Sequence, residues 1–452
     1  MAKAKTVYVC QHCGAIAPRW EGKCSDCGEW NTIVEESRVE AGGKGHGATR
    51  AAAVPVPITA KDSEPPSRLP TGLAECDRVL GGGIVPGSLV LVGGDPGIGK
   101  STLMLQAASH IAKASGPVLY ISGEESFDQA RMRAKRLNAL HDRLLMLTET
   151  DMATVLDRIA SANYACVMVD SIQSMHNDAL GSAAGSVGQV RECANEFLRA
   201  AKGRDVPIFL VGHVTKDGSI AGPRVLEHLV DTVLYFEGEG KHALRILRGV
   251  KNRFGSTNEI GVFEMTDAGL KEVESPSELF LRERPESASG SAVIPSVEGT
   301  RPLLVEVQAL VTESHLATPR RTVTGVNSNR VALILAVLEK RGGLLFSDKD
   351  VYVNVAGGVR LDEPAADLAV ALALASSLLD RAIPRDVAVF GEIGLAGEIR
   401  AVDHARMRTA EASKFGFQTC ILPAGSALDI DTSAIRVVPV RQIREAVDAA
   451  ID

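Results

Sequence analysis

A glycine-rich turn between an apolar strand and a helix is the feature that most constrains the fold of this chain. The turn runs from Gly94 to Ser101, reads GDPGIGKS and fits the pattern GxxxxGK followed by Ser or Thr. An apolar run, Leu89 to Val92, precedes it, and a stretch typical of a helix, Thr102 to Ala114, follows it. The glycines let backbone N–H groups surround phosphate oxygens, and the helix N-terminus adds its positive end. The sequence therefore predicts a loop that binds a nucleoside triphosphate, most favourably ATP.

Two side chains of this loop have specific expected roles. Lys100 would neutralise the β and γ phosphates, and the Ser101 hydroxyl would bind Mg²⁺. The expected nucleotide-binding residues are Gly94, Asp95, Pro96, Gly97, Ile98, Gly99, Lys100, Ser101 and Thr102.

Strand-like apolar runs alternate with helical stretches from Leu69 to about Glu274. This alternation is typical of βαβ units on a mostly parallel sheet and predicts an α/β fold. The expected strands are Ser88 to Val92, Val118 to Ser122, Ala165 to Asp170, Pro207 to Gly212 and Asp231 to Phe236.

Polar residues follow several of these expected strands. Asp170 ends one strand at the carboxyl edge of the sheet, where ligands of such folds bind, so it is the expected second Mg²⁺ residue. Glu124 and Glu125 follow another strand, and Glu124 is the first candidate to orient or deprotonate the attacking water. A surface acid or a helix N-terminal charge is the alternative for Glu124. His213 would sense the γ-phosphate or serve as a structural polar cap.

Four of the eight cysteines form two CxxC pairs separated by ten residues. Each pair lets one tight turn present two thiolates to the same ion, and two turns complete a tetrahedron around zinc. The weaker alternatives are two disulfides or a redox CxxC. Trp20 and Trp30 nearby would cover the site or offer a surface to a partner. The expected zinc ligands are Cys10, Cys13, Cys24 and Cys27.

The chain has 452 residues, a length that suggests about three domains. Its net charge of −7 excludes a protein that coats nucleic acid through its bulk field, so any such contact must be local. No segment resembles a signal peptide or a membrane span, so we expect a cytoplasmic protein without membrane contact. The expected divisions are a zinc finger at 1–34, a flexible linker at 35–67, an ATPase core at 68–274, a second linker at 275–291 and a last domain at 292–452.

Several motifs together resemble the core of the RecA-type ATPases. They are Gly81-Gly82-Gly83, GDPGIGKST from Gly94, SGEES from Ser122 and VDSIQ from Val169. The motif KNRFG and the four-cysteine module narrow the resemblance to the bacterial RadA (Sms) family. RecA-type ATPases hydrolyse ATP between subunits, and the resemblance implies that Lys251 and Arg253 reach a neighbour's nucleotide. The full motif is Lys251, Asn252, Arg253, Phe254 and Gly255.

The last domain resembles the α+β proteolytic domain of Lon. Lon-type peptidases use a Ser nucleophile activated by a Lys. The matching positions here hold Ala365, which has no nucleophile, and Arg406, which stays protonated. We therefore expect the fold without the peptidase chemistry, in a domain that serves assembly or DNA contact.

The resemblance implies a DNA-dependent ATPase that processes recombination intermediates and extends strand exchange with RecA in DNA break repair. It implies ATP, Mg²⁺ and Zn²⁺ as cofactors. It implies single-stranded and branched DNA and the RecA recombinase as partners, and a homo-oligomeric ring that the resemblance makes a hexamer. Because aromatic residues make up only 4% of the chain, DNA binding should rest on phosphate contacts. The alternatives are an ATP-dependent Lon-like peptidase, a regulatory RecA-fold ATPase and a non-enzymatic scaffold.

Overall fold

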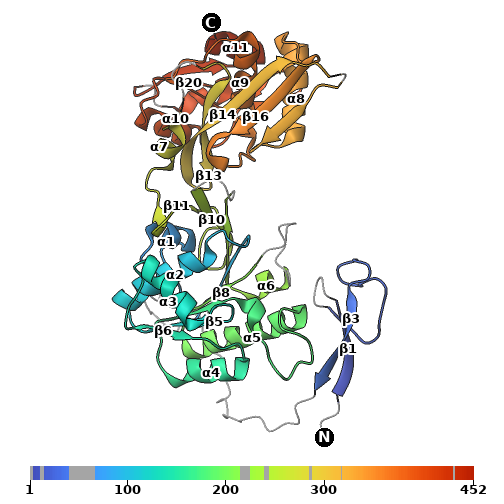
Figure 1. Ribbon diagram of the computed structural model, residues 1–452. Helices are drawn as coiled ribbons and strands as arrows, with labels where there is room; N and C mark the ends of the chain where they lie inside the picture. The colour runs from blue at the N-terminus through green and yellow to red at the C-terminus, as the bar shows by residue number, and fades with distance from the viewer. Residues whose placement is uncertain are drawn as a thin grey trace, which may run out of the picture. The chain divides into compact units, whose positions relative to one another are not determined.

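The computed structural model describes residues 4–10, 15–39, 67–213, 224–238, 244–282, 284, 288–316, 318–430 and 433–451. Cys13 and most of the first expected linker lie outside these ranges. The chain divides into two compact units, Met1–Glu272 and Val273–Asp452, which are described separately (Figure 1). No helix in the described ranges is long and apolar enough to cross a membrane.

A small antiparallel sheet forms the N-terminal module. Its strands are β1 Ala4–Cys10, β2 Ile16–Ala17 and β3 Ile33–Val39, and β1 lies between the other two. Val9 and Ile33 are buried beside the buried thiol of Cys10. β3 continues to Val39, so the strand includes the first residues of the segment expected to be a flexible linker.

Nine strands in the described part of the first unit form one sheet, in the spatial order β12-β11-β10-β9-β4-β8-β7-β5-β6. Neighbours from β9 to β6 are parallel, whereas β10, β11 and β12 form an antiparallel extension beyond β9. The strands are β4 Leu89–Gly94, β5 Val118–Ser122, β6 Leu144–Leu147, β7 Cys166–Asp170, β8 Ile208–Val211, β9 Thr232–Glu237, β10 Leu244–Asn252, β11 Ile260–Thr266 and β12 Gly269–Glu272.

Helices cover both faces of this sheet (Figure 1). Because successive side chains of a strand point to opposite faces, Leu89 and Leu91 of β4 pack into one core, and Val90 and Val92 pack into the other. The first core includes side chains of α4, α5 and α6, and the second includes side chains of α1, α2 and α3. The helices are α1 Ala74–Leu80, α2 Lys100–Ala114, α3 Phe127–Arg136, α4 Met152–Ser161, α5 Val187–Arg204 and α6 Arg224–Leu229, with a short 3-10 turn, η1, at Ile172–Ser174.

The predicted α/β fold is confirmed, and each of the five predicted strands is present within two residues of its expected ends. The helix expected from Thr102 begins at Lys100. The sequence did not separate β6 or the extension from β10 to β12 as strands. In β10, half-buried and buried residues alternate, which is typical of a strand with one partly exposed face.

A mixed sheet lies in the second unit, in the order β15-β16-β14-β13-β17-β20-β21, and β18 pairs with β19 beside it. The strands are β13 Ser291–Glu298, β14 Arg301–Glu313, β15 Arg321–Thr324, β16 Lys349–Val355, β17 Val387–Val389, β18 Glu392–Ile393, β19 Ile399–Arg400, β20 Thr419–Pro423 and β21 Arg436–Val440. The helices are α7 Pro276–Leu281, α8 Ser328–Val337, α9 Asp367–Leu379, α10 Ala405–Lys414 and α11 Ile443–Ile451. Short helical turns are η2 Leu338–Gly342, η3 Ala356–Gly358, η4 Pro364–Ala366 and η5 Ala424–Asp429.

The start of the second expected linker is packed structure. Within it, α7 buries Phe280 and the hydroxyl of Ser277. This hydroxyl donates to Glu411 Oε1 at 2.7 Å and accepts from the Leu304 backbone N–H at 3.0 Å. The charged and small residues of this segment predicted a spacer. Instead, Ser277 and Phe280 lie three positions apart on one side of a helix, and their burial attaches the segment to the second unit.

Candidate functional site

The glycine-rich loop joins the buried strand β4 to α2. Gly94, Gly97 and Gly99 have φ values of 151°, 78° and 116°, in the region that favours glycine. At Gly94 an added Cβ would also lie 2.4 Å from the carbonyl oxygen of Phe236, so no side chain fits there. Gly99 is the N-cap of α2 and offers no side-chain cap. The backbone therefore has the shape of a phosphate-binding loop at a helix N-terminus.

The Lys100 side chain lies inside this loop and is only 4% exposed. Its Nζ donates to the carbonyl oxygens of Gly94 at 2.7 Å and Asp95 at 2.9 Å. Burial lowers the pKa of Lys100, although nearby carboxylates, Asp170 first among them, oppose that shift. An ammonium group held by the loop's own carbonyls fits the β and γ phosphates of a bound nucleotide. Arg245 of β10 supports the loop, because its Nε donates to the Ile98 carbonyl at 3.1 Å.

Asp170 ends β7 and is 8% exposed. The neighbouring strand β5 is in register with it, so that Ser122 pairs with Asp170. Within the sheet, the Tyr120 hydroxyl donates to Asp170 Oδ2 at 2.6 Å. Burial and the adjacent Asp170 carboxylate raise the pKa of Tyr120, so this hydroxyl stays a donor. One carboxylate oxygen of Asp170 is thus fixed by Tyr120.

The two adjacent glutamates have different surroundings. The Ser171 hydroxyl donates to Glu124 Oε1, and His213 Nε2 lies 3.2 Å from the same oxygen. Burial raises the pKa of Glu124, but the hydrogen bonds from Ser171 and His213 outweigh it, and the pKa lies below its ordinary value. Glu125 instead pairs with Arg133 of α3. Ser171 and His213 thus favour the ionised form of Glu124, whereas Glu125 is paired with a cation. The role of Glu124 at the attacking water stays a prediction.

The KNRFG motif packs against the earlier glycine triplet. Arg68 donates to the Leu80 carbonyl at 2.9 Å and to the Phe254 carbonyl at 2.6 Å. Asn252 Nδ2 donates to the same Leu80 carbonyl at 3.3 Å. The two motifs that carried the resemblance are thus joined at one turn, although more than 160 residues separate them.

Lys251 lies against the end of α6. Burial, with the charge of Arg253, lowers the pKa of Lys251. Its Nζ donates to three backbone carbonyls: Glu227 at 2.7 Å, Val230 at 2.9 Å and His228 at 3.4 Å. An ammonium group has three donors, so these carbonyls account for all of them. Lys251 is a C-terminal cap of α6 in this chain.

Arg253 is tied to the start of β9 through Asp231, whose side chain is 1% exposed. Arg253 Nη1 donates to Asp231 Oδ1 at 3.0 Å, and the Leu89 backbone N–H donates to Oδ2 at 3.1 Å. Lys202 Nζ lies 3.3 Å from the same carboxylate. Half of the Arg253 side chain remains exposed. Since a guanidinium has five donors, most of them are still available to a ligand.

Three of the four expected zinc ligands lie together. The Sγ atoms of Cys10, Cys24 and Cys27 are all within 4.8 Å of one another, and those of Cys10 and Cys27 are 3.8 Å apart. Tetrahedral zinc with Zn–S distances of about 2.3 Å requires S···S separations near 3.8 Å. Gly28, at φ 77°, lets its N–H bond the Cys24 carbonyl at 3.0 Å, which closes the knuckle. The residues fit a zinc ion, and Cys13 lies outside the described ranges.

We expect purified protein to contain about one zinc per chain. Cys24→Ser should lose most of this zinc, because three ligands hold the ion poorly, and zinc affinity should fall as pH drops and the thiolates gain protons. Metal analysis by mass spectrometry measures both effects. Cys420→Ser is the matched control, since burial raises the pKa of that thiol and it should leave the zinc content unchanged. Equal zinc loss in both variants would contradict this site.

Comparisons with known proteins cover the whole chain. A profile of the AAA domain matches residues 59–219, a rubredoxin metal binding domain matches 8–35, and the Lon protease C-terminal proteolytic domain matches 331–451. The DNA repair protein RadA of Halalkalibacterium halodurans is 51% identical over 100% of both chains. The RadA proteins of Bacillus subtilis and Pseudomonas aeruginosa are 51% and 50% identical, also over 100% of both chains.

The chain belongs to the RadA family of DNA repair proteins. It is an ATP-hydrolysing enzyme that uses ATP and Mg²⁺ in its core and Zn²⁺ in its N-terminal ribbon. Among solved structures, the RadB recombinase matches 46% of this chain and 100% of that chain, at 24% identity and a TM-score of 0.37. A likeness this distant adds nothing to the family assignment.

In the Lon-like unit, the two positions that match the peptidase residues differ in their exposure to solvent. Ala365 lies in η4 and is 2% exposed, whereas Arg406 is exposed on α10. The buried cation nearby is Arg408, whose Nη2 donates to Glu363 Oε2 at 2.5 Å and whose Nη1 donates to the Pro295 carbonyl at 2.8 Å. An ion pair thus lies next to the position of the missing nucleophile.

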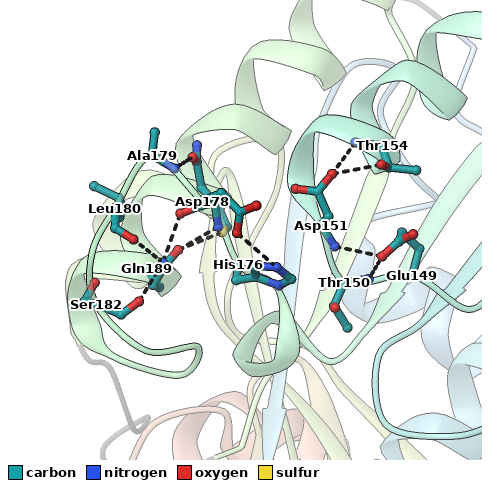
Figure 2. A network of polar contacts seen from close by, with 12 residues as sticks. Glu149, Thr150, Asp151, Thr154, His176, Asp178, Ala179, Leu180, Ser182 and Gln189 are labelled. Atoms are coloured by element: carbon teal, nitrogen blue, oxygen red, sulfur yellow. Dashed lines mark hydrogen bonds and ion pairs between the residues drawn. The ribbon is translucent and has the colours of Figure 1, made fainter. Parts of the chain in front are cut away.

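Figure 2 shows a polar network in the loop that follows β7. Gln189 of α5 accepts from the Asn177 N–H at 2.8 Å and donates to the Ser182 carbonyl at 2.9 Å, so it holds this loop against the helix. One ligand atom each from Asp151, His176 and Asp178 lie within 4.8 Å of one another. Asp151 already caps α4 by accepting from Thr154, and Asp178 is exposed, so local structure explains this cluster.

Sequence reasoning missed Tyr120, Ser171 and Asp231. Tyr120 lies inside an aliphatic strand, and no local pattern indicates that its hydroxyl bonds Asp170. Ser171 directly follows Asp170, and its position next to a strand-end acid was a usable signal. Asp231 begins an expected strand, but nothing local indicated that its carboxylate would be shared by β4, α5 and the KNRFG turn.

Proposed function

We propose that this protein is a DNA-dependent ATPase that acts on recombination intermediates and extends strand exchange with RecA during DNA break repair. The observation that carries the proposal is one sheet edge that holds Lys100, Asp170 and Glu124 in a chain related end to end to DNA repair proteins. The residues at that edge are suited to ATP hydrolysis. Because the relatives are DNA repair proteins, we propose that hydrolysis is coupled to an action on DNA.

The described residues divide the work at the nucleotide. Backbone N–H groups of the glycine-rich loop and the Lys100 ammonium would bind the phosphates, and Ser101 and Asp170 would hold the Mg²⁺ that screens their charge. Glu124 accepts a hydrogen bond from the attacking water, since its lowered pKa keeps the carboxylate ionised and its oxygen lies at the same edge. Ser171 and His213 position this carboxylate. Asp170 in turn is oriented by Tyr120.

Within the KNRFG motif, Arg253 is the stronger candidate to reach a neighbouring subunit's nucleotide. Its guanidinium is half exposed and uses one donor on Asp231, whereas the Lys251 donors are all engaged at the end of α6. An arginine placed on the transferring phosphate is worth roughly 10³ to 10⁵ in rate. Lys251 then supports the turn from which Arg253 projects. This arrangement requires a neighbouring subunit, and we propose that the subunits form a closed ring, a hexamer.

Single-stranded and branched DNA, RecA and further copies of this chain are the partners in this proposal, with the cytoplasm as the compartment where they meet. Exposed cations on α3, namely Arg131, Lys135 and Arg136, are available for phosphate contacts. Arg133, Arg321 and Arg330 are not equally available, because they bond Glu125, the Phe346 carbonyl and Asp367.

Adding single-stranded DNA should raise ATP turnover several-fold, and the DNA affinity should fall steeply with salt because bound cations release counterions from the phosphates. Steady-state hydrolysis with and without DNA, over a salt series, measures both. If the protein binds DNA but its ATP turnover is the same with and without DNA, DNA binding is not coupled to ATP hydrolysis. That result would favour a regulatory ATPase.

A Lon-like peptidase is the alternative function that we do not favour. Ala365 supplies no nucleophile, and the Glu363–Arg408 ion pair lies beside it. Casein should therefore stay intact with and without ATP. Cleavage that is lost when the second unit is altered would favour the peptidase instead.

A further inference from the structure

The chain has only two tryptophans, and both lie on the zinc ribbon. Trp20 is 58% exposed and Trp30 is 66% exposed. Among the described residues the only other exposed aromatic side chain is Phe127. Exposing a large indole surface to water is unfavourable unless a partner covers it. Both indoles of this protein are exposed in this way.

The two rings lie close to one glycine. A Cβ added to Gly22 would lie 3.7 Å from Cη2 of Trp20 and 3.9 Å from Cζ3 of Trp30. The Asn31 N–H donates to the Gly22 carbonyl at 2.8 Å, and Lys23 pairs with Trp30 in an isolated antiparallel bridge. Both rings thus have Gly22 as a common neighbour, and these backbone contacts hold Trp30 beside the segment that carries Trp20. We define Trp20, Gly22 and Trp30 as the indole surface.

Cations lie at the indole surface. Lys23 Nζ is 5.6 Å from the centroid of the Trp30 ring. The Arg19 side chain is 83% exposed, with Glu21 as a loose partner at 3.8 Å. Aromatic rings beside exposed cations are the combination with which proteins bind single-stranded nucleic acid, because every base has a π-face and every linkage has a phosphate. A peptide would need a shaped pocket or a paired strand edge for comparable specificity.

We propose that the indole surface stacks unpaired bases of single-stranded DNA, with Lys23 and Arg19 on the adjoining phosphates. The proposal rests on the DNA-dependent function above and names one surface that takes part in it. It adds base stacking to the phosphate contacts expected from the composition. Duplex DNA is excluded from this surface, because its bases are already stacked on one another.

The test uses full-length, zinc-loaded protein and an oligothymidylate carrying a fluorescent end label. Anisotropy of the label reports DNA binding by any part of the chain. Intrinsic tryptophan emission reports contact at the indole surface alone, because the protein has no other tryptophan. We expect emission to be quenched in step with the rise in anisotropy, and a blunt duplex to leave the emission unchanged.

Trp20→Ala and Trp30→Ala should each weaken oligothymidylate binding by roughly 10-fold, and Trp→Phe at either position should restore most of the affinity. The lost factor should be similar at low and high salt, unlike a lost phosphate contact. Phe127→Ala, at the exposed aromatic side chain outside the ribbon, should bind as the unaltered protein does. A zinc content of one per chain shows that each ribbon variant is folded.

The outcomes separate the two proposals. DNA binding by anisotropy without tryptophan quenching, or Trp20→Ala and Trp30→Ala proteins of unchanged affinity, overturns the stacking surface and leaves the DNA-dependent ATPase standing. Equal quenching by blunt duplex also overturns stacking. Absence of any anisotropy change would sink the DNA-dependent function itself.

Discussion

ATP hydrolysis should fall roughly 100-fold or more when Lys100 is replaced by Ala, because a preorganised charge on the transferring phosphate is lost. The side chain is 4% exposed and lies between two loop carbonyls, so no other cation of the described loop can take its place. Steady-state phosphate release measures the loss. Binding of a fluorescent ATP analogue should weaken as well, since Lys100 contacts the ground state too.

Lys113→Ala is the matched control for this variant. It removes an exposed lysine from the other end of the same helix, α2, and should leave hydrolysis unchanged. Thermal unfolding of both variants should stay close to that of the unaltered protein. Turnover in the Lys100→Ala protein within a factor of two of the control would refute the loop as the catalytic site.

Arg253→Ala should lower turnover by roughly 10³ while ATP binding stays nearly normal, because the guanidinium acts from one subunit on the nucleotide of the next. Mixing provides the sharper result. In random rings of Arg253→Ala and Lys100→Ala subunits, about a quarter of the interfaces join an intact Lys100 to an intact Arg253, so activity should return in the mixture. Phosphate release from the mixture, compared with each variant alone, is the measurement.

Lys202→Met is the control for the Arg253 variant. Lys202 shares the Asp231 carboxylate with Arg253 but lies outside the motif, at 3.3 Å from Oδ2. Its loss should leave turnover within a few-fold of normal. A mixture that stays as inactive as its two components would place Arg253 in its own subunit's site, and an equal loss in Lys202→Met would make the effect structural.

Local patterns predicted much of this protein. Short sequence patterns predicted the loop from Gly94, the strands around it and the acidic residues at the strand ends. The sequence offers Glu124 and Glu125 as neighbouring candidates, and only the structure shows that Glu125 pairs with Arg133. The fold of the last domain followed from resemblance, and the exposed position of Arg406 did not.

Contacts between distant segments could not be predicted. Asp231 accepts from Leu89, 142 residues away, and Arg68 donates to Phe254 across 186 residues. The local sequence of each segment does not predict its hydrogen-bond partner, because the two segments come together only when the sheet has formed. The engagement of Lys251 with the end of α6 is of the same kind, and it is the reason why we favour Arg253 over Lys251.

The position of β4 has a consequence for how the chain can be made and cut. This strand pairs with β8 on one side and β9 on the other, so its backbone is enclosed only after Glu237 has been synthesised. Until then a nascent chain carries the finished loop on a strand with an open edge, which other chains can pair with. A fragment that stops at residue 219, where the AAA profile ends, would keep that edge open. Expression of the nucleotide-binding part should therefore extend through β12, so that both edges of β4 are paired and the fragment does not aggregate through an open strand.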